Sequence, residues 1–234
     1  MSLIRNLAQI WCVTHELGTW ISRCQVSAAW LGLALLLAAS PARAAEELVL
    51  VAFGDSLTAG FGLDEKDAFP TKLASALEAQ GHKVRIVNAG VSGDTTSAGL
   101  ARLDWAIPDD ADAVIVELGA NDALRGQDPE QAYDALDQIL TKLKAKEVAI
   151  LIAGMEAPRN MGPEYVKEFN GIYPRLAKKH GVALYPFFLD GVATDASLNQ
   201  SDGIHPNAEG VTVIVERILS SVQTLLKQAS GNSW

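Results

Sequence analysis

Short runs of apolar, β-branched residues alternate along the chain with longer segments in which apolar residues recur every three or four positions. Runs of the first kind predict buried strands, and segments of the second kind predict amphipathic helices. Strands are expected at Leu48–Phe53, Lys83–Asn88, Ala113–Leu118, Val148–Ala153 and Val182–Tyr185. Helices are expected near Phe69–Gln80, Thr95–Ala106, Pro129–Lys146, Pro163–His180 and Pro206–Lys227.

Glycines follow two of these predicted helices, and prolines stand at the first position of three of them. Gly81 and Gly181 follow predicted helices, at the position where a left-handed backbone favours glycine. Repeated strand–helix units predict an α/β fold in which helices cover both faces of a five-stranded parallel sheet, a three-layer α/β/α sandwich. All strands of such a sheet end at one edge, and ligands bind there.

The first 44 residues have a different pattern. Two arginines precede an apolar stretch, Val26–Ala39, that has the length of a signal-peptide core and is short for a membrane span. Small residues at positions 42 and 44 then fit a cleavage site. We therefore expect residues 1–44 to be a cleaved signal peptide and residues 45–234 to be one exported domain, periplasmic or secreted, without stable membrane insertion. An uncleaved anchor is the alternative.

Composition excludes several kinds of site and partner. Both cysteines, Cys12 and Cys24, lie in the export segment, so the mature domain should contain no disulfide and no cysteine nucleophile. The whole chain carries a net charge of −9, and residues 1–44, with three arginines and one glutamate, carry +2 of it, which leaves −11 for the rest. An acidic domain without a basic run argues against nucleic acid and against anionic lipid surfaces as partners.

Four polar segments follow predicted strands and should therefore meet at one edge of the sheet. Ser56 follows the first strand, and Asn88–Asp94 follows the second. Gly119–Asp122 follows the third strand, and Asp202–Pro206 lies after the fifth. Together they supply a hydroxyl, an imidazole, a carboxylate and hydrogen-bond donors, which are the groups that acyl transfer needs.

The roles of three residues follow from this chemistry. Ser56 is the candidate nucleophile and needs a base, because a hydroxyl is a poor nucleophile at its own pKa. His205 is the candidate base, since His82 precedes a strand at the wrong edge and His180 ends a helix. Asp202 is close enough to accept a hydrogen bond from the imidazole and to fix its tautomer. Alternatively, Ser56 and Asp202 are only helix caps and His205 is merely exposed.

Acyl transfer also needs donors for the oxyanion of the tetrahedral intermediate. We expect the N–H groups of Ser56 and Gly93 and the side-chain amide of Asn121 to supply them. In the alternative, Gly93 is a turn glycine and Asn121 forms an Asx turn. Metal-dependent hydrolysis is disfavoured, because neither an H-x-x-x-H nor an H-E-x-x-H spacing is present.

Taken together, the four segments resemble the SGNH, or GDSL-type, hydrolase family. The residues that carry the resemblance are Gly54-Asp55-Ser56-Leu57, Gly93, Asn121, Asp202 and His205. Within the family, segments such as Val116-Glu117-Leu118-Gly119 and Leu124-Arg125-Gly126 look like those of the exported bacterial arylesterase and thioesterase I/lysophospholipase L1 group.

This resemblance covers the whole mature chain and implies a flavodoxin-like sandwich. It also implies hydrolysis of acyl thioesters, aryl and short-chain esters and lysophospholipids, with no cofactor and with a small acyl substrate as partner. One departure is Ala120, where a second glycine before the asparagine is frequent.

Two segments at the same edge are candidates for binding the acyl chain. The loop after the fourth strand contains Met155, Pro158 and Met161, whose flexible methionines are suited to an apolar groove or to plain packing. Leu124 and Arg125 lie just past Asn121, where they would help to gate the same groove.

Two other functions remain open at this point. A carbohydrate O-acetylesterase would use the same chemistry, with Tyr165 and Phe169 as the aromatic residues available for stacking on a sugar. A non-catalytic binding module that kept the fold is disfavoured by the intact set of Ser56, Asp202 and His205.

Overall fold

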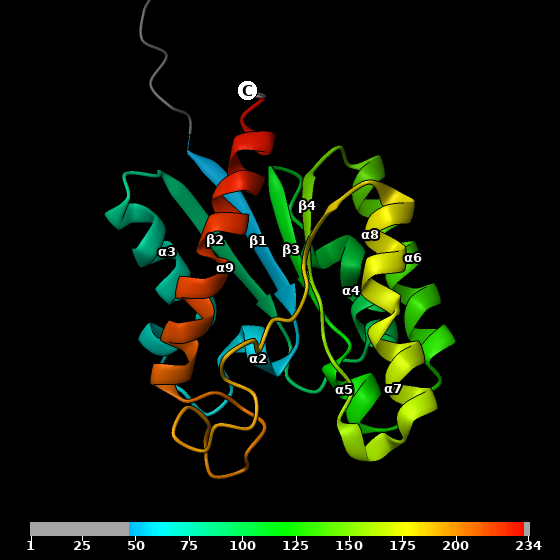
Figure 1. The fold of residues 1–234 in the computed structure, drawn as a ribbon. Coiled ribbons are helices and arrows are strands. Elements are labelled where there is room, and N and C mark those ends of the chain that lie inside the picture. Colours follow the sequence, from blue (N-terminus) through cyan, green and yellow to red (C-terminus); the bar gives the residue numbers. More distant parts are fainter. Residues whose placement is uncertain (1–46, 232–234) are drawn as a thin grey trace, which may run out of the picture. The chain divides into compact units, whose positions relative to one another are not determined.

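The computed structural model describes residues 47–231, which contain a five-stranded parallel sheet with the strand order β2-β1-β3-β4-β5 (Figure 1). The strands are β1 (Leu48–Gly54), β2 (Val84–Gly90), β3 (Ala113–Glu117), β4 (Ala149–Ala153) and β5 (Ala183–Tyr185). Each predicted strand is found, and the predicted three-layer sandwich is confirmed. The expected signal peptide, with both cysteines, lies outside the described residues.

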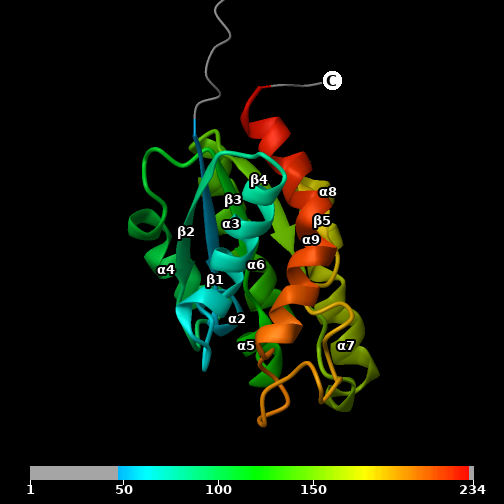
Figure 2. The ribbon, with the colours of Figure 1, turned by 90° about the vertical axis from the view of Figure 1, so that its left-hand side faces the viewer.

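Helices cover both faces of the sheet. α3 and α9 lie together on one face, and α4, α6 and α8 lie side by side on the other (Figures 1 and 2). The long helices are α3 (Phe69–Ala79), α4 (Thr96–Ala106), α6 (Pro129–Ala145), α7 (Pro163–Asn170), α8 (Ile172–His180) and α9 (Ala208–Ala229). Two short helices, α2 (Ser56–Ala59) and α5 (Ala120–Leu124), directly follow β1 and β3, and 3-10 turns span Glu65–Asp67 and Arg159–Met161.

Side chains at the helix starts explain where four of the described α-helices begin, namely α2, α4, α6 and α9. Asp128 accepts a hydrogen bond from the N–H of Glu130 at the start of α6, and Asn207 accepts from the N–H groups of Glu209 and Gly210 at the start of α9. The last helix therefore begins at Ala208, two residues later than predicted. Asp202 lies before it and is not its cap.

The helix predicted over Pro163–His180 is interrupted at Gly171, which separates α7 from α8. The chain still turns in the helical sense there, because the Gly171 N–H donates to the carbonyl oxygen of Lys167 at 3.2 Å. Glycine has the lowest helix propensity of any residue except proline, so a break at this position is the physically expected one.

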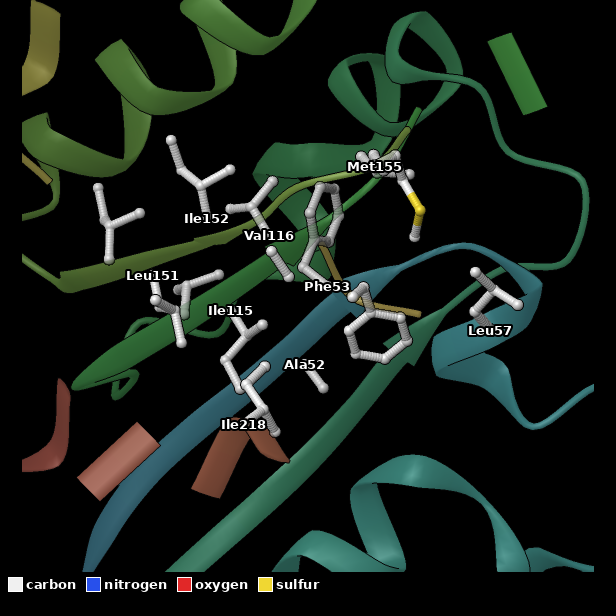
Figure 3. Packing of buried hydrophobic residues seen from close by; sticks show 14 of the residues in the cluster. Ala52, Phe53, Leu57, Ile115, Val116, Leu151, Ile152, Met155 and Ile218 are labelled. Carbon is white, nitrogen blue, oxygen red and sulfur yellow. The ribbon is translucent and has the colours of Figure 1, made fainter. Parts of the chain in front are cut away.

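The main core lies between the sheet and its two helix layers. Every residue of β3 is buried, and side chains from β1, β3, β4 and α9 pack against one another (Figure 3). Residues labelled in the close view include Phe53, Ile115, Val116, Leu151, Ile152 and Ile218. Burying one such side chain stabilises the fold by about 1.5–3 kcal/mol, so the strands are held mainly by apolar packing.

The register of the three central strands positions their ends. Gly54 at the end of β1 pairs with Gly90 of β2 on one side and with Glu117 of β3 on the other. The segments that leave these three strands therefore start at the same level of one edge, as the sequence predicted.

Ile115 tests how much the centre of the sheet contributes to stability. Its side chain is fully buried, so Ile115→Ala is expected to lower the free energy of unfolding by about 2–5 kcal/mol through lost burial and a residual cavity. Urea denaturation measures the change. Trp105→Ala, at a side chain that is 74% exposed on α4, is the control and should change stability by less than about 0.5 kcal/mol. Equal losses in the two variants would contradict this account of the core.

Candidate active site

The turn from β1 into α2 places Ser56 at the edge of the sheet. Asp55 is the cap of α2, since its Oδ1 accepts a hydrogen bond from the Leu57 N–H at 3.0 Å. Ser56 is therefore the first helical residue and not the cap, and its side chain is free for another role. Ser56 is 8% exposed, so the residue is buried with only a small part of it in contact with solvent.

Two glycines let α2 approach the strands this closely. A Cβ atom on Gly54 would lie 2.1 Å from Thr58 Oγ1 and 2.5 Å from Glu117 Oε2. A Cβ atom on Gly90 would lie 2.3 Å from the backbone nitrogen of Ala59. Any side chain at either position would push the serine turn away from the sheet.

Ser56, His205 and Asp202 form one hydrogen-bonded chain. His205 Nε2 lies 3.0 Å from Ser56 Oγ, and His205 Nδ1 lies 2.7 Å from Asp202 Oδ2. A carboxylate can only accept, so Nδ1 carries the proton, and in the neutral imidazole Nε2 is left to accept from the serine hydroxyl. The chain has the order of contacts that activates a serine nucleophile.

Backbone bonds hold Asp202 in its ionised form. Its Oδ1 accepts from the N–H groups of Ile204 and His205, each at 3.0 Å. These bonds, that of Ile204 foremost, and the bond to the His205 ring lower the pKa of Asp202 to about 2. The carboxylate is therefore ionised at neutral pH, and it favours the tautomer described above.

Backbone N–H groups of Ser56 and Gly93 point to no acceptor within residues 47–231. Gly93 has a φ of +86°, a left-handed conformation that favours glycine, and its carbonyl oxygen accepts from Arg125 Nη2 at 2.9 Å. An oxyanion requires free donors near the nucleophile, and Ser56 itself supplies one of these two.

The Asn121 side chain is tied to its surroundings. Its Nδ2 donates to Asp55 Oδ2 at 3.1 Å and to the carbonyl oxygen of Asp94 at 3.0 Å. Both amide hydrogens have acceptors, so a bond from Asn121 to an oxyanion would have to share one of them. The two bonds link the loops that follow β1, β2 and β3.

Charged groups lie buried beneath the serine turn, and sequence reasoning assigned them no role. Glu117 is fully buried; its Oε2 accepts from Thr58 Oγ1 at 2.7 Å, and its Oε1 has no hydrogen-bond partner among the described residues. Arg102 donates to Asp94 Oδ2 and, at 2.8 Å, to the carbonyl oxygen of Gly54. The sequence feature that could have indicated a buried charge is a charged residue within an otherwise apolar strand, which describes Glu117 as the last residue of β3.

Asp55 and Glu117 share this site as two buried carboxyl groups. Burial raises the pKa of Asp55 to about 6. Burial, together with the nearby Asp55 carboxyl, raises the pKa of Glu117 well above its usual range. Both pKa values are raised, so the pair holds a proton up to a higher pH than free carboxyl groups do, which reduces the repulsion between two like charges behind the serine.

The predicted acyl-binding residues differ in how far they are exposed at the edge of the sheet. Leu124 is 48% exposed at the end of α5, and Arg125 binds the Gly93 loop, so both lie at the edge that holds Ser56. Met155 is 2% exposed and packs in the core (Figure 3), which favours its packing interpretation. Pro158 and Met161 are half-buried in and beside the 3-10 turn that follows β4.

Of the five exposed large apolar side chains among the described residues, four lie on segments of the candidate site. They are Phe61, Val91, Leu124 and Ile204. Each is close in sequence to Ser56, Gly93, Asn121 or His205, and the Phe61 ring centroid lies 4.5 Å from that of His205. We refer to these four exposed side chains, which flank the polar residues of the site in sequence, as its apolar rim.

The aromatic pair considered for sugar stacking is at most partly exposed, because Tyr165 is half-buried. Phe169 is fully buried, and the Tyr165 hydroxyl donates to the carbonyl oxygen of Gln127 at 2.8 Å. Within residues 47–231, no group of three or more His, Cys, Asp or Glu side chains is arranged to hold a metal ion. In the same range, no helix is long and apolar enough to cross a membrane.

Comparison with known proteins adds independent information. The sequence matches the GDSL-like Lipase/Acylhydrolase family over residues 52–213. It is 38% identical over 195 residues to Esterase TesA of Pseudomonas aeruginosa, covering 83% of this chain and 96% of that protein. It is 39% identical over 189 residues to Thioesterase 1/protease 1/lysophospholipase L1 of Escherichia coli strain K12, covering 80% and 89%.

A solved structure agrees with these sequence matches. The crystal structure of AlinE4, described as an esterase of the SGNH-hydrolase family, superposes with a TM-score of 0.65 at 48% sequence identity. The match covers 77% of this chain and 97% of that one. The expected family and the expected fold are therefore both confirmed.

Glu117 provides a test of the buried carboxyl pair. Its folded-state pKa is raised, so the folded state binds a proton that the unfolded state releases above pH ~4.3. Stability is lost as the pH rises from that value through the raised pKa. Glu117→Gln removes the titration, so the variant should gain stability relative to the wild type as the pH increases from ~5 to ~8.

Chemical denaturation at several pH values measures this difference. The exposed Glu168, changed to glutamine, is the matched control and should show no such trend. A Glu117→Gln difference that stays constant with pH, or that moves in the opposite direction, would contradict a proton held on this pair.

Proposed function

Because the chain belongs to the GDSL-like lipase/acylhydrolase family, we propose that it hydrolyses carboxylic esters and thioesters through an acyl-enzyme on Ser56. The observation that carries this proposal is the chain of contacts from Ser56 Oγ to His205 Nε2 and from His205 Nδ1 to Asp202 Oδ2. The N–H groups of Ser56 and Gly93, which have no acceptor among the described residues, support it.

In the first half of the reaction, Ser56 Oγ attacks the acyl carbon and His205 Nε2 takes the hydroxyl proton. The carbonyl oxygen becomes an oxyanion, which accepts from the N–H groups of Ser56 and Gly93 and shares a hydrogen of the Asn121 amide. When the bond to the leaving group breaks, the imidazolium returns the proton to the departing alcohol or thiol.

Water completes the cycle. His205 accepts a proton from the water molecule as it attacks the acyl-enzyme, and it returns the proton to Ser56 Oγ when the acid leaves. Asp202 stays ionised throughout, because its lowered pKa keeps it from taking the proton of the imidazolium. This chemistry needs no cofactor.

We propose small acyl esters, acyl thioesters and lysophospholipids as the substrate class. Support comes from the names of the relatives, an esterase and a thioesterase/lysophospholipase, and from the four exposed apolar side chains around the site. An acyl chain lying on such a rim removes apolar surface from water on both partners. The net charge of −9 argues against nucleic acid as a partner.

We further propose that the protein is exported and acts in the periplasm or outside the cell. The support is the sequence of residues 1–44 alone, with its arginines, its short apolar stretch and its small residues before position 45.

Ser56→Ala tests the mechanism directly. Removing the nucleophile is expected to lower kcat for p-nitrophenyl esters by a factor on the order of 10³ or more, with little change in stability. The variant should also fail to react with a fluorophosphonate probe that labels the wild type. Ser75→Ala, at an exposed serine of α3, is the control and should keep full activity. Near-normal esterase activity in Ser56→Ala would refute the proposed nucleophile.

Leu124→Ala tests the apolar rim. Truncating a half-exposed side chain is expected to lower kcat/KM for p-nitrophenyl octanoate by about 3–10-fold, since each buried CH₂ contributes about 0.8 kcal/mol. The value for p-nitrophenyl acetate should change less than about twofold. An unchanged ratio of the two would show that Leu124 does not contact the acyl chain. A wild type that hydrolyses acetyl esters alone would instead favour the O-acetylesterase alternative.

A further inference from the structure

We propose that Gln200 and Phe61 are positioning residues that hold His205 at bonding distance from Ser56. This inference rests on the proposed function, because it assigns His205 the role of the base. His205 lies on the long loop between β5 and α9, whereas Ser56 lies on α2, so contacts between these two segments must hold the base near the nucleophile.

The loop that carries His205 is stabilised mostly by hydrogen bonds among its own residues. Between β5 and α9 the chain forms turns, with an isolated bridge between Asn199 and Pro206. The Gln200 N–H donates to the His205 carbonyl oxygen at 2.8 Å, and the Asn207 N–H donates to the Leu198 carbonyl oxygen at 3.0 Å. These bonds shape the tip of the loop but do not attach it to the nucleophile.

Two hydrogen bonds join the segments 54–63 and 198–207 within the described part of the chain. One is the bond between Ser56 and His205 itself. The other runs from Gln200 Nε2 to the Phe61 carbonyl oxygen, at 2.7 Å across 139 residues of sequence. Apart from the bond between Ser56 and His205, the hydrogen bonding of segment 198–207 to segment 54–63 therefore depends on the side-chain amide of Gln200.

Both hydrogens of the Gln200 side-chain amide are donated to backbone carbonyl oxygens. Nε2 also donates to the Pro206 carbonyl oxygen at 3.0 Å, so its two hydrogens bridge the two segments. Together with its backbone N–H, Gln200 binds the carbonyl oxygens of His205, Pro206 and Phe61. The amide lies tightly against Gly62, whose φ is +73° and where a Cβ atom would lie 2.2 Å from Gln200 Oε1.

Phe61 connects the same residues from the other side. Its N–H donates to the Ser56 carbonyl oxygen at 3.1 Å, so its position follows that of the nucleophile. Its ring lies 4.5 Å from the imidazole of His205, tilted by 35°, although the residue is 48% exposed. The Phe61 ring therefore covers one side of the imidazole of His205.

The contacts form a closed circuit. It runs from the Ser56 carbonyl to Phe61, from the Phe61 carbonyl to Gln200, from Gln200 to the backbone of His205, and from the imidazole back to Ser56 Oγ. A displacement of about 1 Å between reacting groups can cost on the order of 10²-fold in rate. Opening the circuit should therefore lower kcat more than it raises KM.

Gln200→Glu is the sharpest variant, because it keeps the shape of the side chain and removes both donated hydrogens. We expect kcat to fall about 10-fold or more, KM to change less than about threefold, and the thermal midpoint to stay near that of the wild type. Gln200→Ala, which adds no charge, should lower kcat to a similar extent. Gln138→Glu is the matched control, since that exposed side chain donates a hydrogen bond to the Asp134 carbonyl oxygen of its own helix, and it should leave kcat unchanged.

Phe61 is tested without touching the hydrogen bonds of the loop. Phe61→Leu, which keeps apolar bulk but loses the ring, should lower kcat about 3–10-fold. Phe61→Tyr, which keeps the ring, should restore it. These two variants decide the question if a substitution at Gln200 prevents folding.

A double-mutant cycle separates positioning from a general structural effect. If Gln200 acts through the imidazole, Gln200→Glu should cause no further loss in a His205→Ala background, measured on a p-nitrophenyl ester. Full additivity of the two losses would overturn the proposal. So would wild-type kcat, within about twofold, in both Gln200→Ala and Phe61→Leu. Failure of the proposed function would look different: the wild type itself would then show no turnover that depends on Ser56.

Discussion

The candidate site depends on the close approach of α2 to the ends of β1, β2 and β3. Gly54 and Gly90 have no room for a side chain, because Thr58, Glu117 and the backbone of Ala59 occupy the space that a Cβ atom would need. The register of the sheet brings these strand ends to the same level. As a result, the serine hydroxyl, its own N–H and the loops after β2 and β3 meet within one small region.

This close packing has an electrostatic consequence. Asp55 must cap α2 from inside the protein, and Glu117 lies beside it with one oxygen that lacks a hydrogen-bond partner among the described residues. Two ionised carboxylates there would repel each other in a medium of low dielectric constant. The raised pKa of both groups favours their protonated forms and so reduces that repulsion. Asp202, which is held by backbone N–H groups nearer the surface, keeps its charge instead.

Much of this arrangement could be predicted from the sequence, for identifiable reasons. Apolar periodicity predicted every strand, and the rule that parallel strands end at one edge of a sheet predicted that Ser56 and His205 lie close together. Contacts made across the loops could not be predicted in this way. The packing of Met155 in the core, the bond from Arg125 to Gly93 and the bond from Gln200 to Phe61 depend on where irregular segments cross, and hydrophobic periodicity carries no such information.

The two halves of the site differ in how they are held. Ser56 lies on an element that is packed against the central strands, so its position is fixed by the same burial that stabilises the fold. His205 and Asp202 lie on a loop of turns, and few contacts join that loop to the serine segment. Loops tolerate change better than sheets, and they carry function on a rigid scaffold. In such a molecule, changes in the loops can alter rate and substrate preference while the sheet keeps the nucleophile in place.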